Sequence, residues 1–360
     1  MLQMKVALVY DRVNKWGGAE RVLLALNELF PDSPLYTSVY SPKNAPWAKV
    51  FPKVIPSYLQ KLQFAQSRHE FFPLLMPHIF ESFNFENYDL VISITSEAAK
   101  GIITKGKTKH ICYLLTPTRY LWSGKNQYFK STLIKQITSP ALSYLKKWDK
   151  MAAQRSDQLI SISKTVQKRA KKYYGRDSQI IYPPVEVEKF LNQKSQTGSH
   201  FLVVSRLVPY KKVDLVIETF NKLGLPLIIV GTGSEEKKLR QKANNNIKFM
   251  GHVTDKKLAN LYRASKALIF PQLEDFGITA VEAMAVGKPV IAYNKGGARD
   301  TLIDGKTGIF FDQQKYESLA GAVSRFAKMK FDNAIISTHA QKFSKQRFKK
   351  EFLSAINKKV

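Results

Sequence analysis

The chain has 360 residues, 44% of them hydrophobic and 24% charged, which is the composition of a globular protein with about two domains. It contains no apolar run of the roughly 20 residues that span a bilayer and no signal-peptide pattern at its start. A single cysteine excludes an intramolecular disulfide and argues against a cysteine-based metal site, so we expect a cytoplasmic protein. The formal net charge is +29, and the excess of Lys and Arg is spread over both halves of the chain.

Short apolar runs alternate with helical patterns in the first half, which predicts parallel α/β units. The first strand, at residues 5–10, leads through Gly17 and Gly18 into a helix at residues 19–30. Further strands are predicted at residues 89–95, 109–115, 158–163 and 179–182. The aromatic stretch 71–85 has two interpretations, a pair of short buried helices or an element on a membrane surface.

Pro183 and Pro184 end the first series, because no helix can continue through them. We interpret residues 1–185 as the first domain and the polar segment 186–199 as a linker. A second series follows, with strands predicted at residues 200–205, 226–231, 247–250, 267–270 and 289–293. The fold class is therefore α/β, with two Rossmann-like, doubly wound parallel-sheet domains that face each other across a cleft, the second at residues 200–340. The final helix, within residues 341–360, has an apolar face that must dock on the rest of the protein.

The strongest chemical pattern lies between residues 270 and 311. Glu274 is on the loop after a predicted strand, and Glu282 lies about one turn into the helix that follows. The backbone N–H groups at the start of that helix would bind a diphosphate well. They belong to Gly277, Ile278 and Thr279. Glu282 could then accept two hydrogen bonds from a ribose, and Glu274 could meet hydroxyl groups of the group attached to the diphosphate. Two glutamates alone would also fit an acidic helix start that complements the helix dipole.

A pair of cations follows another predicted strand. Arg206 comes directly after it and Lys211 lies at the start of the next helix, so together they could neutralise a diphosphate and stabilise it as a leaving group. Two glycine pairs also follow strands and would let backbone approach a phosphate, although ordinary turns explain them as well: Gly17 with Gly18, and Gly231 with Gly233.

Most of the chain resembles glycosyltransferase family 4. The resemblance is carried by EDFGITAVEAMAVGKPVIA and NKGGARDTLIDGKTGIFF in the second half, by SRLVPYKKVDL and IIVGTGSEE before them, and by WGGAERV and ICYLLTPTRYLW in the first half. It implies the GT-B architecture of two Rossmann-like domains, a nucleotide-sugar donor bound mainly by the second domain, and transfer with retention of anomeric configuration. It also implies that the final helix crosses back onto the first domain.

The same resemblance implies roles for individual positions. Arg206 and Lys211 would contact the donor diphosphate, Glu282 the ribose, and Val253 would lie beside the base. The transferred sugar and the phosphates would face Glu274 and the backbone of Phe276, Gly277, Ile278 and Thr279. Gly17 and Gly18 would approach the diphosphate and the acceptor, and Arg119 and Tyr120 would lie on the acceptor side.

Within the family, PLLMPHIFESFNFENYDLVIS and TPTRYLW most resemble the bacterial mannosyltransferase branch that extends lipid-linked oligosaccharides. GDP-mannose and a polyprenyl-diphosphate-linked glycan are therefore the expected donor and acceptor, in surface polysaccharide synthesis. A protein bound peripherally at the inner face of the plasma membrane would use its basic surface to contact anionic lipids. No metal or other cofactor is expected, which agrees with the absence of an Asp-x-Asp tripeptide.

Leu115 departs from the family pattern, because relatives usually carry a histidine before the Thr-Pro pair. That histidine is associated with the donor sugar, so either the sugar contact is altered here or another group replaces the histidine. Three alternatives stay open: a UDP-sugar donor, a non-catalytic nucleotide-sugar-binding protein, and a basic nucleic-acid-binding protein. The last would explain the charge but leave Glu274 and Glu282 without a role, so no nucleic acid is expected as partner.

Overall fold

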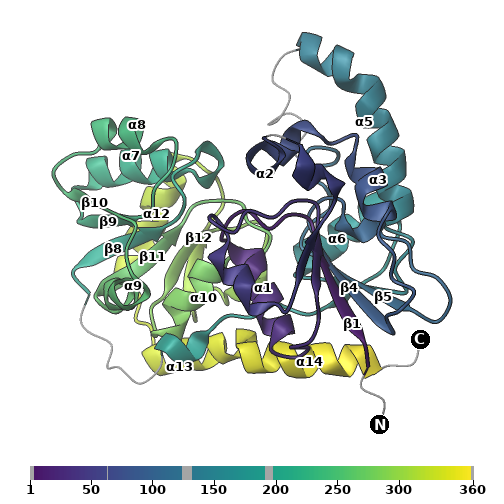
Figure 1. The fold of residues 1–360 in the computed structure, drawn as a ribbon. Coiled ribbons are helices and arrows are strands. Elements are labelled where there is room, and N and C mark those ends of the chain that lie inside the picture. The colour runs from purple at the N-terminus through teal and green to yellow at the C-terminus, as the bar shows by residue number, and fades with distance from the viewer. Residues whose placement is uncertain (1–3, 63, 124–131, 191–197, 358–360) are drawn as a thin grey trace. The chain divides into compact units, whose positions relative to one another are not determined.

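The computed structural model describes residues 4–62, 64–123, 132–190 and 198–357. The chain forms two compact units (Figure 1). Unit 1 contains Met1–Pro183 together with Lys349–Val360, and unit 2 contains Pro184–Phe348. No helix among the described residues is long and apolar enough to cross a membrane.

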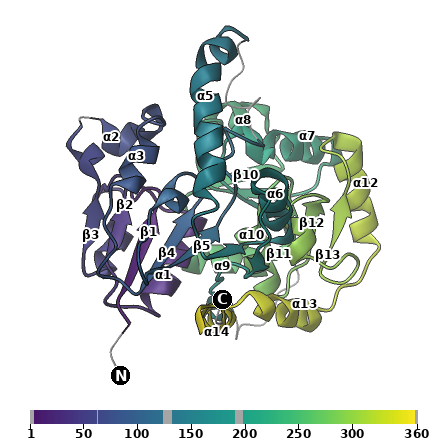
Figure 2. The ribbon, with the colours of Figure 1, turned by 90° about the vertical axis from the view of Figure 1, so that its right-hand side faces the viewer.

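Unit 1 is built on a seven-stranded parallel sheet in the order β3-β2-β1-β4-β5-β6-β7. Its central strands are buried on both faces, as the continuous apolar runs in their sequences predict. Figure 2 shows β3, β2, β1, β4 and β5 side by side in this order. The strands are β1 Val6–Tyr10, β2 Leu35–Thr37, β3 Val54–Pro56, β4 Leu90–Thr95, β5 Lys109–Leu114, β6 Gln158–Ser161 and β7 Gln179–Ile180.

The helices of unit 1 lie between these strands in the chain. They are α1 Gly18–Asn27, α2 Ala65–Arg68, α3 Met76–Glu81, α5 Thr132–Ala152 and α6 Lys164–Tyr174. The ends of α6 are set by its sequence. Ser163 caps the first turn by accepting a hydrogen bond from the Val166 N–H at 3.1 Å. Gly175 ends the helix with φ of 72°, a left-handed conformation that favours glycine. α5 is the longest and projects beyond the rest of unit 1 in both views (Figures 1 and 2).

Unit 2 has a six-stranded parallel sheet in the order β10-β9-β8-β11-β12-β13. In both units the chain starts in the middle of the sheet, adds two strands on one side and then returns to the other side. This is the doubly wound order, and its reversal defines a switch point between β1 and β4 in unit 1 and between β8 and β11 in unit 2. The strands are β8 His200–Val204, β9 Leu227–Val230, β10 Ile247–Gly251, β11 Ser265–Phe270, β12 Val290–Tyr293 and β13 Gly308–Phe311.

The helices of unit 2 bury one face each against this sheet or against one another. α7 and α12 pack together, and the core beneath them includes Phe201, Phe220 and Phe311. The helices are α7 Val213–Leu223, α8 Glu236–Lys242, α9 Asp255–Arg263, α10 Ile278–Ala285, α11 Ala298–Thr301, α12 Tyr316–Ala327 and α13 Asn333–Ala340.

The last helix, α14 Lys345–Asn357, begins in unit 2 and ends in unit 1. Its apolar face is buried in unit 1 at Phe352, whose ring lies 6.0 Å from that of Tyr113. Lys349 forms an ion pair with Glu28, and the Lys109 ammonium donates to the Ile356 carbonyl at 3.1 Å.

The two doubly wound parallel sheets are as predicted. The boundary between the units differs from the expected linker, because Val185 already pairs with Ser344 and residues 186–190 contain a 3-10 helix, Val187–Phe190, that packs on α10. Two apolar residues of this otherwise polar segment, Val187 and Phe190, are buried. The rest of the expected linker, residues 191–197, lies outside the described residues.

The aromatic stretch 71–85 contains one short helix, α3, flanked by a 3-10 turn at His69–Phe71. Ile79, Phe80 and Phe85 are buried in the unit 1 core, whereas Phe71 and Leu74 are exposed. The buried interpretation therefore holds for its second part.

Candidate functional site

The strand order of unit 2 brings most of the predicted donor-binding residues to one edge of the sheet. β10, β9, β8 and β11 are neighbours, and parallel strands end at the same edge. The segment after each of the four strands holds predicted residues: Val253 after β10, Gly231 and Gly233 after β9, Arg206 and Lys211 after β8, and, after β11, Glu274, Phe276 and Gly277 in the loop with Ile278 and Thr279 at the start of α10.

Lys211 and Glu274 meet across the switch point. Lys211 ends the short 3-10 helix Pro209–Lys211 after β8, and its ammonium group forms an ion pair with the carboxylate of Glu274 on the loop after β11. Their side chains are 14% and 19% exposed, so the pair is shielded but can be reached by a ligand. The attraction between the two charges is stronger than in a fully exposed ion pair, because water screens it less.

Arg206 lies beside this pair and is connected to it through Tyr210. The guanidinium group donates to the Tyr210 hydroxyl at 2.7 Å, and the Lys211 ammonium lies 5.3 Å from the centre of the Tyr210 ring. Arg206 is exposed. Two cations thus lie together after β8, and Lys211 is paired with the Glu274 carboxylate.

Glycines shape the loop that carries Glu274. Gly277 precedes α10 with φ of 104°, a left-handed conformation that favours glycine, and a Cβ there would lie 2.9 Å from the Phe270 ring. Gly297 supports the loop from behind: its N–H donates to the Glu274 carbonyl at 2.8 Å, and a Cβ would lie 2.3 Å from Cα of Phe276. The NKGGARD segment therefore holds the Glu274 loop through close backbone contact.

Glu282 lies in the middle of α10 and is only 2% exposed. Its carboxylate accepts a hydrogen bond from the Tyr262 hydroxyl of α9 at 3.0 Å. This contact fixes the carboxylate, and a role at the ribose stays a prediction. Val253 is half-buried just beyond β10.

The remaining predicted residues belong to unit 1. Gly17 and Gly18 begin α1 after β1. Two residues into that helix, buried Glu20 accepts a hydrogen bond from the Tyr10 hydroxyl at 3.0 Å, and burial raises the pKa of its carboxyl group. These glycines lie in the other unit from Lys211, so their predicted approach to the diphosphate stays a prediction.

The loop after β5 carries Leu115, Arg119 and Tyr120, all half-buried. Tyr120 packs against a small apolar cluster that includes Leu121 and Leu145. The acceptor-side role predicted for Arg119 and Tyr120 also stays a prediction.

Sequence reasoning missed a polar cluster at the switch point of unit 1. Arg12 follows β1 and Glu97 follows β4, and Nη1 of Arg12 lies 2.5 Å from Oε1 of Glu97. His69 is near enough to Arg12 for the guanidinium charge to lower the histidine pKa, and Asn14 lies 3.3 Å from His69. The available signal was that Arg12 and Glu97 each lie two positions after the end of a buried strand.

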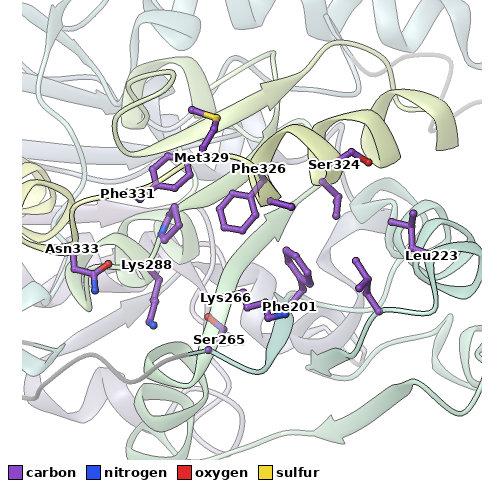
Figure 3. Close-up of a pocket in the computed structure, with 15 residues that line it drawn as sticks. Phe201, Leu223, Ser265, Lys266, Lys288, Ser324, Phe326, Met329, Phe331 and Asn333 are labelled. Atoms are coloured by element: carbon purple, nitrogen blue, oxygen red, sulfur yellow. The ribbon is translucent and has the colours of Figure 1, made fainter.

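A cavity of about 600 Å³ in unit 2 lies elsewhere (Figure 3). Phe201, Phe326 and Phe331 are among its lining residues, together with Ser265 and Lys288. Phe201 and Ser265 lie at the starts of β8 and β11, so this cavity is at the amino ends of the strands. Ligands of doubly wound sheets bind at the opposite edge, and we therefore place the candidate site at the carboxyl ends.

Comparisons with known proteins identify what the chain is similar to. Residues 184–347 match the model of a family described as glycosyl transferases group 1. An uncharacterized glycosyltransferase of Methanocaldococcus jannaschii, MJ1178, is 27% identical over 202 residues, which cover 55% of this chain and 57% of that protein. The O-antigen chain mannosyltransferase RfbU of Salmonella typhimurium is 28% identical over 212 residues, which cover 51% of this chain and 59% of RfbU. The chain thus spans somewhat more than half the length of these curated relatives.

Solved structures show the likeness over both units. Anabaena Alr3699/HepE, solved in complex with UDP, has a TM-score of 0.74 at 19% identity, with 98% of this chain and 99% of that chain covered. The chain therefore has the GT-B fold, and residues 184–347 within it are similar to the glycosyl transferases group 1 family.

Proposed function

We propose that this protein is a retaining glycosyltransferase that moves a sugar from a nucleotide-sugar donor to a glycan acceptor without a metal ion. The observation that carries the proposal is the ion pair of Lys211 and Glu274 at the switch point of unit 2, with Arg206 beside it. The match of residues 184–347 to group 1 glycosyl transferases supports it.

The ion pair suggests how a donor would bind. A diphosphate carries two negative charges or more, so it competes with Glu274 for Lys211 and also attracts Arg206. Once Lys211 turns to the diphosphate, the Glu274 carboxylate is released to accept hydrogen bonds from hydroxyl groups of the attached sugar. The N–H groups at the start of α10 add partial positive charge at the phosphates.

In the reaction, the bond between the sugar C1 and the diphosphate oxygen breaks and a bond from C1 to the acceptor hydroxyl oxygen forms on the same face. The acceptor proton passes to the leaving diphosphate. Arg206, Lys211 and the α10 N-terminus stabilise the charge that develops on that leaving group, which is the work a divalent cation does in other enzymes. Glu274 orients the sugar.

GDP-mannose is our first choice of donor, and a lipid-linked glycan in surface polysaccharide synthesis is our first choice of acceptor. The similarity to RfbU, a mannosyltransferase of O-antigen chains, supports both. HepE was solved in complex with UDP, which favours a UDP-sugar as the second candidate. We place the protein in the cytoplasm, peripheral at the inner face of the plasma membrane, where its charge of +29 would favour contact with anionic lipids.

The test is calorimetric titration of the full chain with GDP, UDP and ADP and their sugar conjugates, in EDTA. Selective binding of one nucleotide, followed by NMR of the product anomer formed on a glycan acceptor, would support a retaining transferase. Binding without turnover on any acceptor would indicate a nucleotide-sugar-binding protein instead. Activity that disappears in EDTA and returns with magnesium would contradict the metal-independent mechanism.

A further inference from the structure

The switch point of unit 1 carries the same kind of charge pair as that of unit 2. Arg12 follows β1 and Glu97 follows β4, just as Lys211 follows β8 and Glu274 follows β11. Arg12 and Glu97 are 14% and 30% exposed, with 2.5 Å between Nη1 and Oε1. A doubly wound sheet binds ligands at this point, and the donor-binding role proposed for unit 2 leaves this second pair unused.

The backbone of Glu97 is held from both sides by buried charges. Asp11, 3% exposed, accepts hydrogen bonds from the N–H of Glu97 at 3.0 Å, of Ala98 at 2.9 Å and of Ala99 at 2.8 Å. The ammonium group of Lys100, 1% exposed, donates to the Glu97 carbonyl. Such supports fix the backbone that carries the Glu97 side chain, and a binding site requires a side chain held by a rigid backbone.

Lys100 is itself anchored by a buried network. Its ammonium group lies 2.5 Å from Asp149 Oδ1, and both side chains are 1% exposed. Asp149 also accepts hydrogen bonds from the Thr118 hydroxyl at 2.7 Å, the Trp122 indole at 2.7 Å and the Tyr174 hydroxyl at 2.8 Å. The network therefore ties the Glu97 loop to the Thr-Pro-x-Arg-Tyr loop after β5.

Polar atoms beside the pair have unused hydrogen-bonding capacity. Within the described ranges of the chain, neither Nε of Arg12 nor Oδ1 of Asn14 has a hydrogen-bond partner, although both atoms are buried. Nδ2 of Asn14 lies 3.3 Å from Nδ1 of His69. The same Nδ1 atom lies 3.2 Å from Oε2 of Glu70. Burial and the charge of Arg12 lower the pKa of His69 to about 4, so its imidazole is neutral at pH 7.

We propose that Arg12 and Glu97, with Asn14 beside them, bind the acceptor by hydrogen bonds to hydroxyl groups of a neutral sugar. One hydroxyl donates to the Glu97 carboxylate and another accepts from the Arg12 guanidinium, both as charge-assisted hydrogen bonds. The assignment of the ligand as the acceptor rests on the transferase function proposed above.

The charges at the site select a neutral ligand. Glu97 already neutralises Arg12, and its carboxylate would repel a phosphate or a carboxylate. Around His69, the cations Arg12 and Lys15 are balanced by the carboxylates of Asp11, Glu70 and Glu97. In unit 2, Arg206 lies beside the Lys211–Glu274 pair. A sugar that presents adjacent hydroxyl groups fits the unit 1 pair, since each hydroxyl can donate to one partner and accept from the other.

Saturation-transfer NMR on the full chain tests this proposal with methyl α-D-mannoside, methyl β-D-glucoside and methyl β-D-galactoside as probes. The variants are Glu97→Gln and Arg12→Lys. Glu81→Gln is a matched control, because Glu81 also pairs with an arginine, Arg155, at 2.7 Å and its side chain is likewise 30% exposed, but it lies on α3. Thermal unfolding of each variant checks the fold, and calorimetry with GDP and UDP reports on unit 2 separately.

We expect at least one hexoside to bind the wild-type chain and Glu81→Gln alike, and to bind Glu97→Gln and Arg12→Lys at least tenfold more weakly, with nucleotide binding unchanged. Hexoside binding within twofold of wild type in Glu97→Gln would overturn the site. So would a wild-type chain that binds none of the three hexosides at millimolar concentration, or displacement of the bound hexoside by pyrophosphate. Failure of GDP and UDP to bind, with Glu97-dependent hexoside binding intact, would remove the transferase function and leave the sugar site standing.

Discussion

Lys211 and Glu274 are 63 positions apart in the chain, and their ion pair connects the segments that follow β8 and β11 at the switch point of the unit 2 sheet. Without a donor, each charge is satisfied by the other. A bound diphosphate would replace Glu274 as the partner of Lys211, so donor binding and release of the sugar-binding carboxylate would be the same event. This coupling leads to opposite effects of substitutions at the two residues.

Replacing Lys211 should weaken donor binding. Lys211→Ala removes a charge-assisted contact to the diphosphate, and we expect the affinity for the nucleotide diphosphate to fall about tenfold to a hundredfold. Calorimetry measures the change. Lys222→Ala is the control, because Lys222 pairs with Glu218 on the exposed face of α7, and an equal loss in that variant would show a general effect of charge rather than a site.

Close backbone packing behind the Glu274 loop makes Gly297 sensitive to a single added carbon. Gly297→Ala places a Cβ 2.3 Å from Cα of Phe276, and such overpacking destabilises by about 1 to 3 kcal/mol. The displaced loop should also bind the donor more weakly. Gly321→Ala is the comparison, since it lies within α12 with only Arg325 Nη1 nearby at 3.9 Å, and alanine there should stabilise by up to about 1 kcal/mol. Chemical denaturation distinguishes the two, and equal unfolding free energies would contradict the packing argument.

The buried pair of Lys100 and Asp149 should matter for stability. Lys100→Met leaves the Asp149 charge buried without its cation, although three other donors remain, and breaking a buried pair costs about 3 to 5 kcal/mol. Thermal and urea unfolding measure this. Lys222→Met at an exposed pair should change the unfolding free energy by less than about 1 kcal/mol. A Lys100→Met protein as stable as wild type would show that the network does not hold the Glu97 loop.

Two buried histidines should make the protein less stable in mild acid. Burial lowers the pKa of His110 to about 3 and that of His69 to about 4. Unfolded histidine takes up a proton near pH 6.5, whereas the folded protein does so only at much lower pH. The free energy of unfolding should therefore decrease as the pH falls from about 6.5 towards 4, by up to about 1.4 kcal/mol per pH unit for each histidine.

His110→Gln tests the cause of this acid sensitivity. A glutamine can still accept from Ser93, whose hydroxyl lies 2.8 Å from Nε2 of His110, but it does not titrate. Urea denaturation between pH 7 and 4 should give a shallower slope for this variant. Parallel slopes for variant and wild type would mean that other groups cause the acid sensitivity.

The sequence predicted the parts of the fold that have continuous apolar runs. β8, β11 and α10 lie close to their predicted positions, because buried parallel strands and Gly277 at a helix start leave clear patterns. β2 and β3 were not predicted, since they have only three residues each and β3 ends in a proline, Pro56. Their positions depend on pairing between strands, of β2 with β1 and of β3 with β2, rather than on a local pattern.

The site was predictable where its residues are near one another in the chain. Glu274 and Gly277 stand out because strand, loop and helix follow directly. Two pairings could not be predicted, because they depend on which strands are neighbours in the sheet: Lys211 with Glu274, and Arg12 with Glu97. No local sequence pattern indicates the strand order. The burial of Glu282 under Tyr262 likewise comes from packing between α9 and α10.

The most direct test of the central claim compares Glu274→Gln with wild type in two assays, GDP and UDP binding in EDTA and sugar transfer. Removal of the carboxylate frees Lys211. We therefore predict that the variant binds the preferred nucleotide, GDP or UDP, as tightly as the wild-type protein does or more tightly. Transfer should fall by about a hundredfold or more, because the sugar loses its carboxylate contact. A Glu274→Gln protein that transfers sugar at a near-normal rate, or that loses nucleotide binding while it remains folded, would contradict the account.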